Sequence, residues 1–261
     1  MTTTESSTIK VFSPEMLGVG EFDQGKITEI KPIDFPRGTG KGKPIGPLFY
    51  WAWASANGDG IIGMHPHKAF EIISYVIKGE LGHSDSLENK TKVGEGGAQV
   101  IQAGSGIFHQ EEMYGQRTEF FQIWFEPDLQ KTVQDPPAYN QYSNDQFPVD
   151  NKDGTLIKHV IGNGSPVSLV AETLIDDVSI PQNQSYSRIV PENKCLAVTV
   201  IEGTGNVQVL NENHMILSQY FLDIRAKNEF EITFRPSGNK NLRIVAVEIP
   251  SSVEYPLYGG R

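Results

Sequence analysis

Short apolar runs with strand-like spacing, separated by turns that contain Gly or Pro, constrain the fold of this chain most strongly. Runs rich in Val, Ile, Phe and Tyr cover residues 70–77, 120–125, 196–201 and 242–249. Within residues 229–235, Phe230, Ile232 and Phe234 alternate with polar residues, and residues two apart on a strand point to the same face. Long amphipathic helical patterns are scarce. The sequence therefore predicts an all-β protein built as barrels or sandwiches.

A polar segment with several prolines interrupts this pattern near the middle of the chain. Residues 127–148 contain Pro127, Pro136, Pro137 and Pro148. Because proline cannot donate to a strand ladder, the segment is a poor strand, and we expect it to connect two β domains of similar size. The predicted limits are an N-terminal domain at residues 1–130, a linker at 131–148 and a C-terminal domain at 149–261.

The charge and the cysteine count exclude some classes of function. The chain has 261 residues and a net charge of −10, which argues against non-specific binding to nucleic acid or to anionic membranes, since both require a positive surface. The single cysteine, Cys195, cannot form an internal disulfide, as expected in a reducing compartment. With neither a secretory leader nor an apolar run of about 18 residues, the sequence predicts a cytoplasmic protein, with nuclear entry left open for a eukaryotic one.

Two pairs of candidate metal ligands occur at strand spacing, His65 with His67 and His109 with Glu111. Each pair can direct both side chains to one point, because residues two apart share a strand face. If the two strands face each other across a barrel, they form a cage of three imidazoles and one carboxylate. This ligand set suits a first-row divalent metal. Glu71 shares the parity of the first pair, so spacing alone does not decide between Glu71 and Glu111.

The other three histidines show no such pairing. We expect His83 at the rim of the barrel, because it follows the turn at Gly82. His159 and His214 are solitary, and a metal site needs several converging ligands. The sequence therefore places its metal chemistry in the first half of the chain.

The histidine-bearing segments resemble the two signature motifs of the cupin superfamily and, more narrowly, the motifs of the pirin family. Pirins carry H-P-H-x-G-F-E, H-x-D-S and A-G-x-G-I-x-H-x-E, and this chain has HPHKAFE at residues 65–71, HSDS at 83–86 and AGSGIFHQE at 103–111. Lys68 and Ala69 depart from the commoner Arg-Gly and affect the rim of the pocket. The similarity is strong over residues 60–142 and diffuse elsewhere.

The resemblance implies a bicupin, with two cupin-type β-barrels in one chain and the metal motif in the first barrel only. It also implies that His65, His67, His109 and Glu111 are the metal ligands, which favours Glu111 over Glu71. The expected metal is Fe(II), with Mn, Ni, Cu, Co and Zn as alternatives, and no organic cofactor is expected. Four protein ligands leave two adjacent positions of an octahedral ion open.

The resemblance also suggests a function. Some pirins resemble quercetin 2,3-dioxygenases, so the leading hypothesis is a metal-dependent dioxygenase that acts on a flavonol or a related enol or phenolic substrate with O₂. Glu111 would be the catalytic base, because it is the only one of these ligands able to take a substrate proton at the metal. The alternative is a non-enzymatic metal or redox sensor that binds a transcription factor or a metabolic enzyme. Pirins also suggest a monomer, and the motif departures disfavour a sugar-isomerase-like cupin.

Overall fold

The computed structural model describes residues 7–260, which divide into two compact units that interleave along the chain. The N-terminal unit comprises Leu17–Phe147, Pro166–Ala171 and the described part of the segment from Glu254. The C-terminal unit comprises the described residues up to Met16 together with Pro148–Ser165 and Glu172–Val253. These limits differ from the predicted 1–130 and 149–261, because strand pairing overrides chain order. β1 (Thr8–Phe12) pairs with β18 (Phe221–Arg225) of the later sequence.

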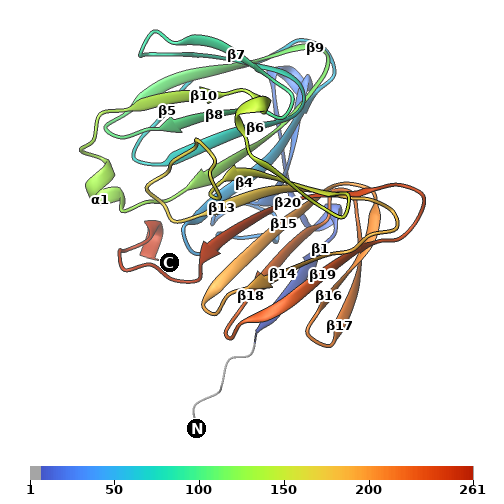
Figure 1. Cartoon of the computed structure of the whole chain (residues 1–261). Helices are drawn as coiled ribbons and strands as arrows, with labels where there is room; N and C mark the ends of the chain where they lie inside the picture. Colours follow the sequence, from blue (N-terminus) through green and yellow to red (C-terminus); the bar gives the residue numbers. More distant parts are fainter. Residues whose placement is uncertain (1–6, 261) are drawn as a thin grey trace. The chain divides into compact units, whose positions relative to one another are not determined.

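The N-terminal unit is built on one antiparallel sheet in the order β10-β8-β6-β9-β4-β3-β2, with β5 added on β9 and β7 on β6 (Figure 1). Its strands are β2 (Gly18–Phe22), β3 (Ile27–Ile33), β4 (Leu48–Ala56), β5 (Gly60–His67), β6 (Glu71–Asp85), β7 (Lys90–Gly94), β8 (Ala98–Gln102), β9 (Ile107–Phe125) and β10 (Ala138–Tyr142). Because β10 lies inside residues 131–148, the expected linker also contributes a sheet strand.

The two longest strands of this unit, β6 and β9, organise its core. They pair along most of their length, and the register shifts on both sides of Lys78. Gly79 lies next to this irregularity at a φ of +80°, a left-handed conformation that glycine adopts without steric cost. Val76, Leu81 and Phe120 from these strands are fully buried together. Such an irregularity bends the strands, and the bend lets β6 and β9 curve around a shared interior.

The C-terminal unit is a sandwich of two antiparallel sheets (Figure 1). One sheet has the order β1-β18-β15-β20-β13-β12-β11 and the other β14-β19-β16-β17. The strands not yet given are β11 (Val149–Lys152), β12 (Thr155–Ile161), β13 (Leu174–Ile180), β14 (Tyr186–Val190), β15 (Lys194–Glu202), β16 (Thr204–Val209), β17 (Glu212–Leu217), β19 (Phe230–Pro236) and β20 (Leu242–Pro250). Ile232 and Phe234 of β19 enter the core as their alternation predicts, and Phe230 packs against it. Thr233 departs from the pattern, because it is also buried and shares a hydrogen bond with Ser187.

The all-β class and the cupin-like architecture are confirmed, but the sheets are open. In the N-terminal unit the order begins at β10 and ends at β2, and these two strands do not pair with each other. Each unit is therefore an open jelly roll rather than a closed barrel. The helical elements are α1 (Leu129–Thr132) and the 3₁₀ turns η1 (Pro14–Met16), η2 (Asp23–Gly25), η3 (Asn144–Gln146) and η4 (Tyr258–Gly260). Within residues 7–260, no helix is long and apolar enough to cross a membrane.

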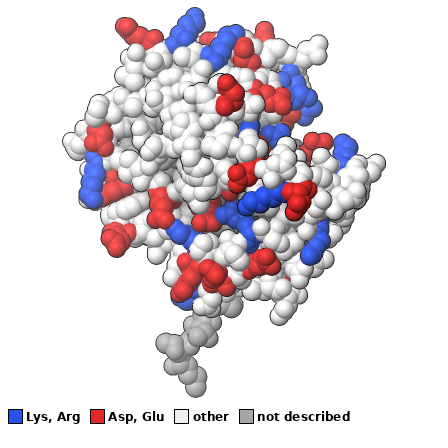
Figure 2. Space-filling model, in the orientation of Figure 1, with Lys and Arg blue, Asp and Glu red and all other residues white. Residues whose placement is uncertain are grey.

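Acidic and basic side chains are interspersed on the face drawn in Figure 2. The red and blue side chains lie close to one another there rather than in separate areas. This mixture agrees with the modest net charge of −10 over 261 residues. It offers no support for a nucleic-acid surface, which would require Lys and Arg gathered on one side.

Candidate metal centre

Two neighbouring strands bring the three predicted histidines together. β5 pairs antiparallel with β9, with His65 directly opposite His109 and His67 opposite Ile107. Opposite residues on adjacent strands present their side chains to the same face, so the imidazoles of His65, His67 and His109 converge. Their candidate ligand atoms all lie within 4.8 Å of one another. The two pairs thus lie side by side on adjacent strands. The sequence had suggested instead that they face each other across a barrel.

The ring nitrogens have the spacing that a bound metal requires. Nε2 of His67 and Nε2 of His109 are 2.9 Å apart. Two imidazole nitrogens that bind one ion at right angles would be about 3.0 Å apart, given metal–nitrogen bonds of about 2.1 Å. Nδ1 of His65 lies 2.8 Å from the carbonyl of Gly63. A proton donated there leaves Nε2 of His65 free to bind a metal, the usual way in which a ligand histidine is oriented.

Burial keeps two of these histidines in the form that binds metals. Burial lowers the pKa of His67 to about 3, with a further contribution from the charge of His65. Burial also lowers the pKa of His109 to about 2, helped by the neighbouring His67 and His65. Both rings are therefore neutral at physiological pH, and a metal displaces no proton from their free nitrogens.

Glu111 adds a buried carboxylate that is only half satisfied. Its Oε1 accepts hydrogen bonds from Nε2 of Gln122 at 2.6 Å and from Oγ of Ser74 at 3.2 Å. Its Oε2 is buried and accepts no hydrogen bond from any described residue. Burial raises the pKa of Glu111, while the charge of His65 opposes this rise. A buried carboxylate oxygen without a partner is costly, and a cation held by the histidines would remove that cost.

Glu71 has a different environment, although it shares the strand parity of the histidines. Its Oε1 accepts from the backbone N–H of Val170 at 2.7 Å and from Gln102 Nε2 at 2.8 Å, and its Oε2 accepts from the N–H of Ala171 at 2.8 Å. Both oxygens are therefore occupied. Glu71 fastens the short segment Pro166–Ala171 to the sheet of its own unit. The cluster of converging ligand atoms consists of His65, His67 and His109 and includes neither Glu71 nor the predicted fourth ligand, Glu111. The two glutamates differ in that Glu111 keeps an unpaired buried oxygen.

His83 does not lie at the rim where we expected it. It is 2% exposed, and its Nε2 is 2.7 Å from Oδ2 of Asp85. Its ring stacks on Tyr139 at 3.9 Å and lies 5.4 Å from the ring of His109. β6 continues through Gly82 to Asp85, so this glycine does not form the turn that suggested an exposed histidine. His83 thus packs beside the metal cluster, whereas His159 and His214 belong to the other unit.

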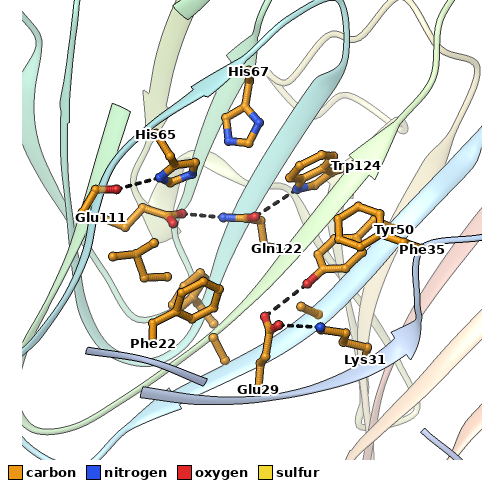
Figure 3. A pocket seen from close by; sticks show the side chains of 15 residues that line it. Phe22, Glu29, Lys31, Phe35, Tyr50, His65, His67, Glu111, Gln122 and Trp124 are labelled. Atoms are coloured by element: carbon orange, nitrogen blue, oxygen red, sulfur yellow. Dashed lines mark hydrogen bonds and ion pairs between the residues drawn. The ribbon is translucent and has the colours of Figure 1, made fainter. Parts of the chain in front are cut away.

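A cavity of about 430 Å³ opens onto the cluster, a volume within the range of small-molecule sites. Its walls are largely apolar, and Figure 3 shows His65, His67 and Glu111 on one side of it. Five aromatic rings contribute to the rest of the lining, from Phe22, Phe35, Tyr50, Phe120 and Trp124, together with the aliphatic side chains of Ala52, Ala54 and Ile62.

A second polar group lies away from the histidines in the same cavity (Figure 3). Glu29 accepts a hydrogen bond from the Tyr50 hydroxyl at 3.1 Å and forms an ion pair with Lys31 Nζ at 3.0 Å. Sequence reasoning missed these residues. The available signal was parity, because Glu29 and Lys31 share the strand face of the buried Ile27. Charged residues at buried strand positions are uncommon and indicate a lined cavity.

Comparisons with known proteins agree with the motifs. Residues 52–125 match the Pirin family model. A "Pirin-like protein" of Caulobacter vibrioides is 30% identical over 60% of this chain and 59% of its own length. A "Putative quercetin 2,3-dioxygenase" of Pseudomonas aeruginosa is 30% identical over 56% of this chain and 61% of its own length. The matches thus span about three fifths of these relatives.

A solved structure shows the same fold at lower sequence identity. The crystal structure of the bacterial pirin YhhW from Escherichia coli in complex with nickel(II) is 19% identical. It superposes with a TM-score of 0.76 over 93% of this chain and 99% of that one. The likeness extends through both units, so it supports the two-domain cupin-like architecture as a whole.

Proposed function

Since this chain carries a pirin domain at residues 52–125, we propose that it is a metal-dependent oxygenase for a flat aromatic enol or phenol of the flavonol type. One observation carries the proposal. A cavity of about 430 Å³ with aromatic walls reaches His65, His67 and Glu111, so a small aromatic molecule could contact an ion held there. A sealed cluster would instead suit the sensor role considered from the sequence. The name of the Pseudomonas relative supports the same chemistry.

The metal would be held by His65, His67, His109 and Glu111. Neutral imidazoles and a carboxylate suit a first-row divalent ion, and Fe(II) is the leading candidate, with Mn, Ni, Cu, Co and Zn as alternatives. The nickel(II) complex of a structural neighbour supports a transition metal in this fold. When bound, such an ion would supply Lewis acidity for a phenolic oxygen and bring the substrate and O₂ together.

Glu111 would act as the catalytic base. Among the four proposed ligands, only its carboxylate can take a substrate proton while it lies beside the ion. The Trp124 Nε1–H donates to Oε1 of Gln122 at 2.9 Å, and Gln122 Nε2 donates to Glu111. These two successive hydrogen bonds fix the orientation of the Gln122 amide, so that its NH₂ group faces the carboxylate of Glu111. Oε1 is thereby held in place. Oε2 is the oxygen left to contact the ion, and it would change its binding mode to take the substrate hydroxyl proton.

The walls and the distant polar group would orient the substrate. The rings of Phe35 and Tyr50 stack at 4.4 Å with an interplanar angle of 16°, and Trp124 contacts both. Aromatic faces of this kind bind flat rings. Glu29, which the Tyr50 hydroxyl and Lys31 already contact, offers an acceptor for a second hydroxyl on the substrate. These groups would place one end of the substrate at the metal.

The test begins with the metal content of the purified protein and continues with substrate consumption. Elemental analysis should find about one transition-metal ion per chain, and the loaded protein should consume quercetin or a simple catechol together with O₂. Glu111→Gln should keep the substrate bound and abolish turnover, whereas Glu71→Gln should leave turnover intact. Loaded protein that leaves quercetin and catechols untouched would contradict the oxygenase proposal. Capture of one stoichiometric protein partner in that case would favour the sensor role.

A further inference from the structure

A second hollow lies in the N-terminal unit, apart from the histidines. It has a volume of about 800 Å³ and is lined by Phe35, Pro36, Arg37, Phe49, Phe70, Tyr258 and Gly259. We propose that this hollow binds a small aromatic molecule that carries an anionic group, with the rings holding the aromatic part and Arg37 pairing with the anion. The proposal goes beyond the oxygenase function and does not depend on it.

The hollow is a cluster of aromatic rings that face one another. The ring centroids of Phe49 and Phe70 are 4.8 Å apart, and Tyr258 lies 5.9 Å from Phe49 at an angle of 88°. Phe35 and Tyr258 remain 38% and 57% exposed, although such rings are normally driven out of water. Exposed rings that line one concave surface are typical of a ligand site.

Arg37 is the distinguishing polar group of this hollow. Within residues 7–260, each of the other arginines has a side-chain partner: Arg117 pairs with Glu119, Arg188 with Glu248, Arg225 with Asp223, Arg235 with Gln208 and Arg243 with Asp177. The guanidinium of Arg37 makes no ion pair or hydrogen bond in that part of the chain. No acidic side chain lines the hollow. An unpaired guanidinium beside aromatic rings suits a carboxylate, sulfonate or phosphate on an aromatic ligand.

The loop that carries Arg37 is fixed in place. The side chain of Asp34 is 3% exposed and accepts hydrogen bonds from the N–H groups of Phe35 at 2.9 Å and Gly40 at 3.0 Å. The N–H of Gly38 donates to the Phe35 carbonyl at 2.8 Å and closes a tight turn. A Cβ on Gly38 would lie 2.1 Å from Asp34, so glycine is required at this point. Arg37 is therefore presented by a preorganised turn, which reduces the entropy that binding would cost.

The opposite wall is also anchored. The Tyr258 N–H donates to the carboxylate of Glu126, and the Tyr255 hydroxyl donates to the Glu126 carbonyl at 2.8 Å. Phe35 lines both this hollow and the cavity beside the histidines, so the two sites are neighbours. The hollow is thus a formed second site next to the metal cavity, and it differs from that cavity by its positive charge.

The experiment compares two probes that differ in charge, naphthalene-2-sulfonate and neutral 2-methoxynaphthalene, by titration calorimetry on the metal-loaded protein. Neither probe carries the phenolic hydroxyl that the metal cavity is proposed to bind. Arg37→Gln should weaken sulfonate binding about tenfold, as expected for loss of one charged hydrogen bond, and should change 2-methoxynaphthalene binding much less. Arg37→Lys should retain part of the sulfonate affinity. Lys41→Gln is the matched control, because it removes an exposed positive charge of the same loop that does not line the hollow.

Two further variants keep this site distinguishable from the metal centre. Tyr258→Ala should weaken both probes, and Glu111→Gln should weaken neither. Equal losses of sulfonate affinity in Arg37→Gln and Lys41→Gln would mean that only the general charge of the loop matters, and would overturn the proposal. Unchanged sulfonate binding in Arg37→Gln would overturn it as well. Failure of the oxygenase assay alone leaves these binding results unaffected.

Discussion

Buried histidines occur in both units, and their surroundings differ. In the C-terminal unit, Nδ1 of His159 lies 2.7 Å from Asp176, and Arg188 bridges Asp176 at 3.4 Å and Glu248 at 2.5 Å. Every charge in this network has a partner of opposite sign. Such a network is complete within the protein and requires no ligand.

In the N-terminal unit, by contrast, buried polar atoms at and beside the histidine cluster lack hydrogen-bond partners. Nδ1 of His109 and Oε2 of Glu111 are buried and find no hydrogen-bond partner among the described residues. Buried polar atoms are nearly always paired, and a cation beside the three histidines would pair Oε2 of Glu111. It would not pair Nδ1 of His109, because the other ring nitrogen of that residue, Nε2, is the one that approaches His67. The contrast teaches that burial of a histidine does not identify a site. An unpaired buried carboxylate oxygen together with three converging imidazoles is the combination found only in the N-terminal unit among the described residues.

The largest expected effect comes from breaking the complete network. Arg188→Met should lower the free energy of unfolding of the C-terminal unit by about 3–5 kcal/mol, because Asp176 and Glu248 would keep buried charges without a cation. Thermal unfolding followed by circular dichroism measures the loss. Lys240→Met is the control, since that side chain is 70% exposed and lies 3.8 Å from Glu202, and it should change stability by about 0.5 kcal/mol or less. Equal effects of the two variants would mean that the network is dispensable.

The next largest effect concerns metal affinity. His109→Asn should weaken metal binding by about a hundredfold or more, because even loss of a residue that merely supports a ligand costs about 10–100-fold. His159→Asn should leave the affinity unchanged, although it also removes a buried histidine. Competition with a chromogenic chelator measures both. Similar affinities for the two variants would remove the distinction between the units.

The metal-free protein should lose stability in acid because His67 and His109 are buried in their neutral form. The unfolded pKa of a histidine is about 6.5, and the folded values of His67 and His109 are about 3 and 2. Between these limits the unfolded state binds protons that the folded state does not. The free energy of unfolding therefore falls as the pH decreases, by about 2 kcal/mol for both residues together between pH 6 and pH 5.

Chemical denaturation of the metal-free protein at both pH values provides the measurement. A variant with both His67→Ala and His109→Ala should lose this part of the pH dependence, while its carboxylates continue to titrate as before. A pH dependence that is unchanged in the double variant would show that the buried rings are protonated or solvated in the folded state.

The smallest expected effect separates the two glutamates. Glu111→Gln should weaken metal binding about tenfold, since a neutral amide replaces a charged ligand. Glu71→Gln should leave the affinity unchanged, because both oxygens of Glu71 already accept hydrogen bonds. The same chelator competition applies. A greater loss in Glu71→Gln would reverse the assignment.

Strand periodicity was sufficient to predict the local part of this molecule. The spacing of two residues brought His65, His67 and His109 to one face, and the alternation around Phe234 predicted its buried side. These features depend only on neighbours along a strand. Which strands lie next to each other depends on pairing over long sequence distances, and the adjacency of β5 and β9 was therefore not predictable.

Residues with distant partners were the least predictable. Glu71 and Glu111 have the same parity, and Glu71 is distinguished by the N–H of Val170, 99 residues away. His83 follows a glycine that usually marks a turn, but pairing with β7 and β9 carries the strand through it. The membership of β1 in the C-terminal unit has the same cause, since its partner β18 comes more than two hundred residues later.

β5 has a consequence for how an ion would leave the protein. Among the described strands it pairs only with β9, and it carries His65 and His67. No second strand pairs with its other edge, where the Ile61 N–H donates to Oδ2 of Asp23 at 3.3 Å. A strand held on one side opens locally at a lower free energy than the whole unit unfolds. An ion bound by His65 and His67 of β5 and by His109 of β9 would hold the two strands together. The rate of amide exchange in β5 and the rate of metal release would therefore rise and fall together. The lifetime of the bound metal would then be set by the fraying of one edge strand.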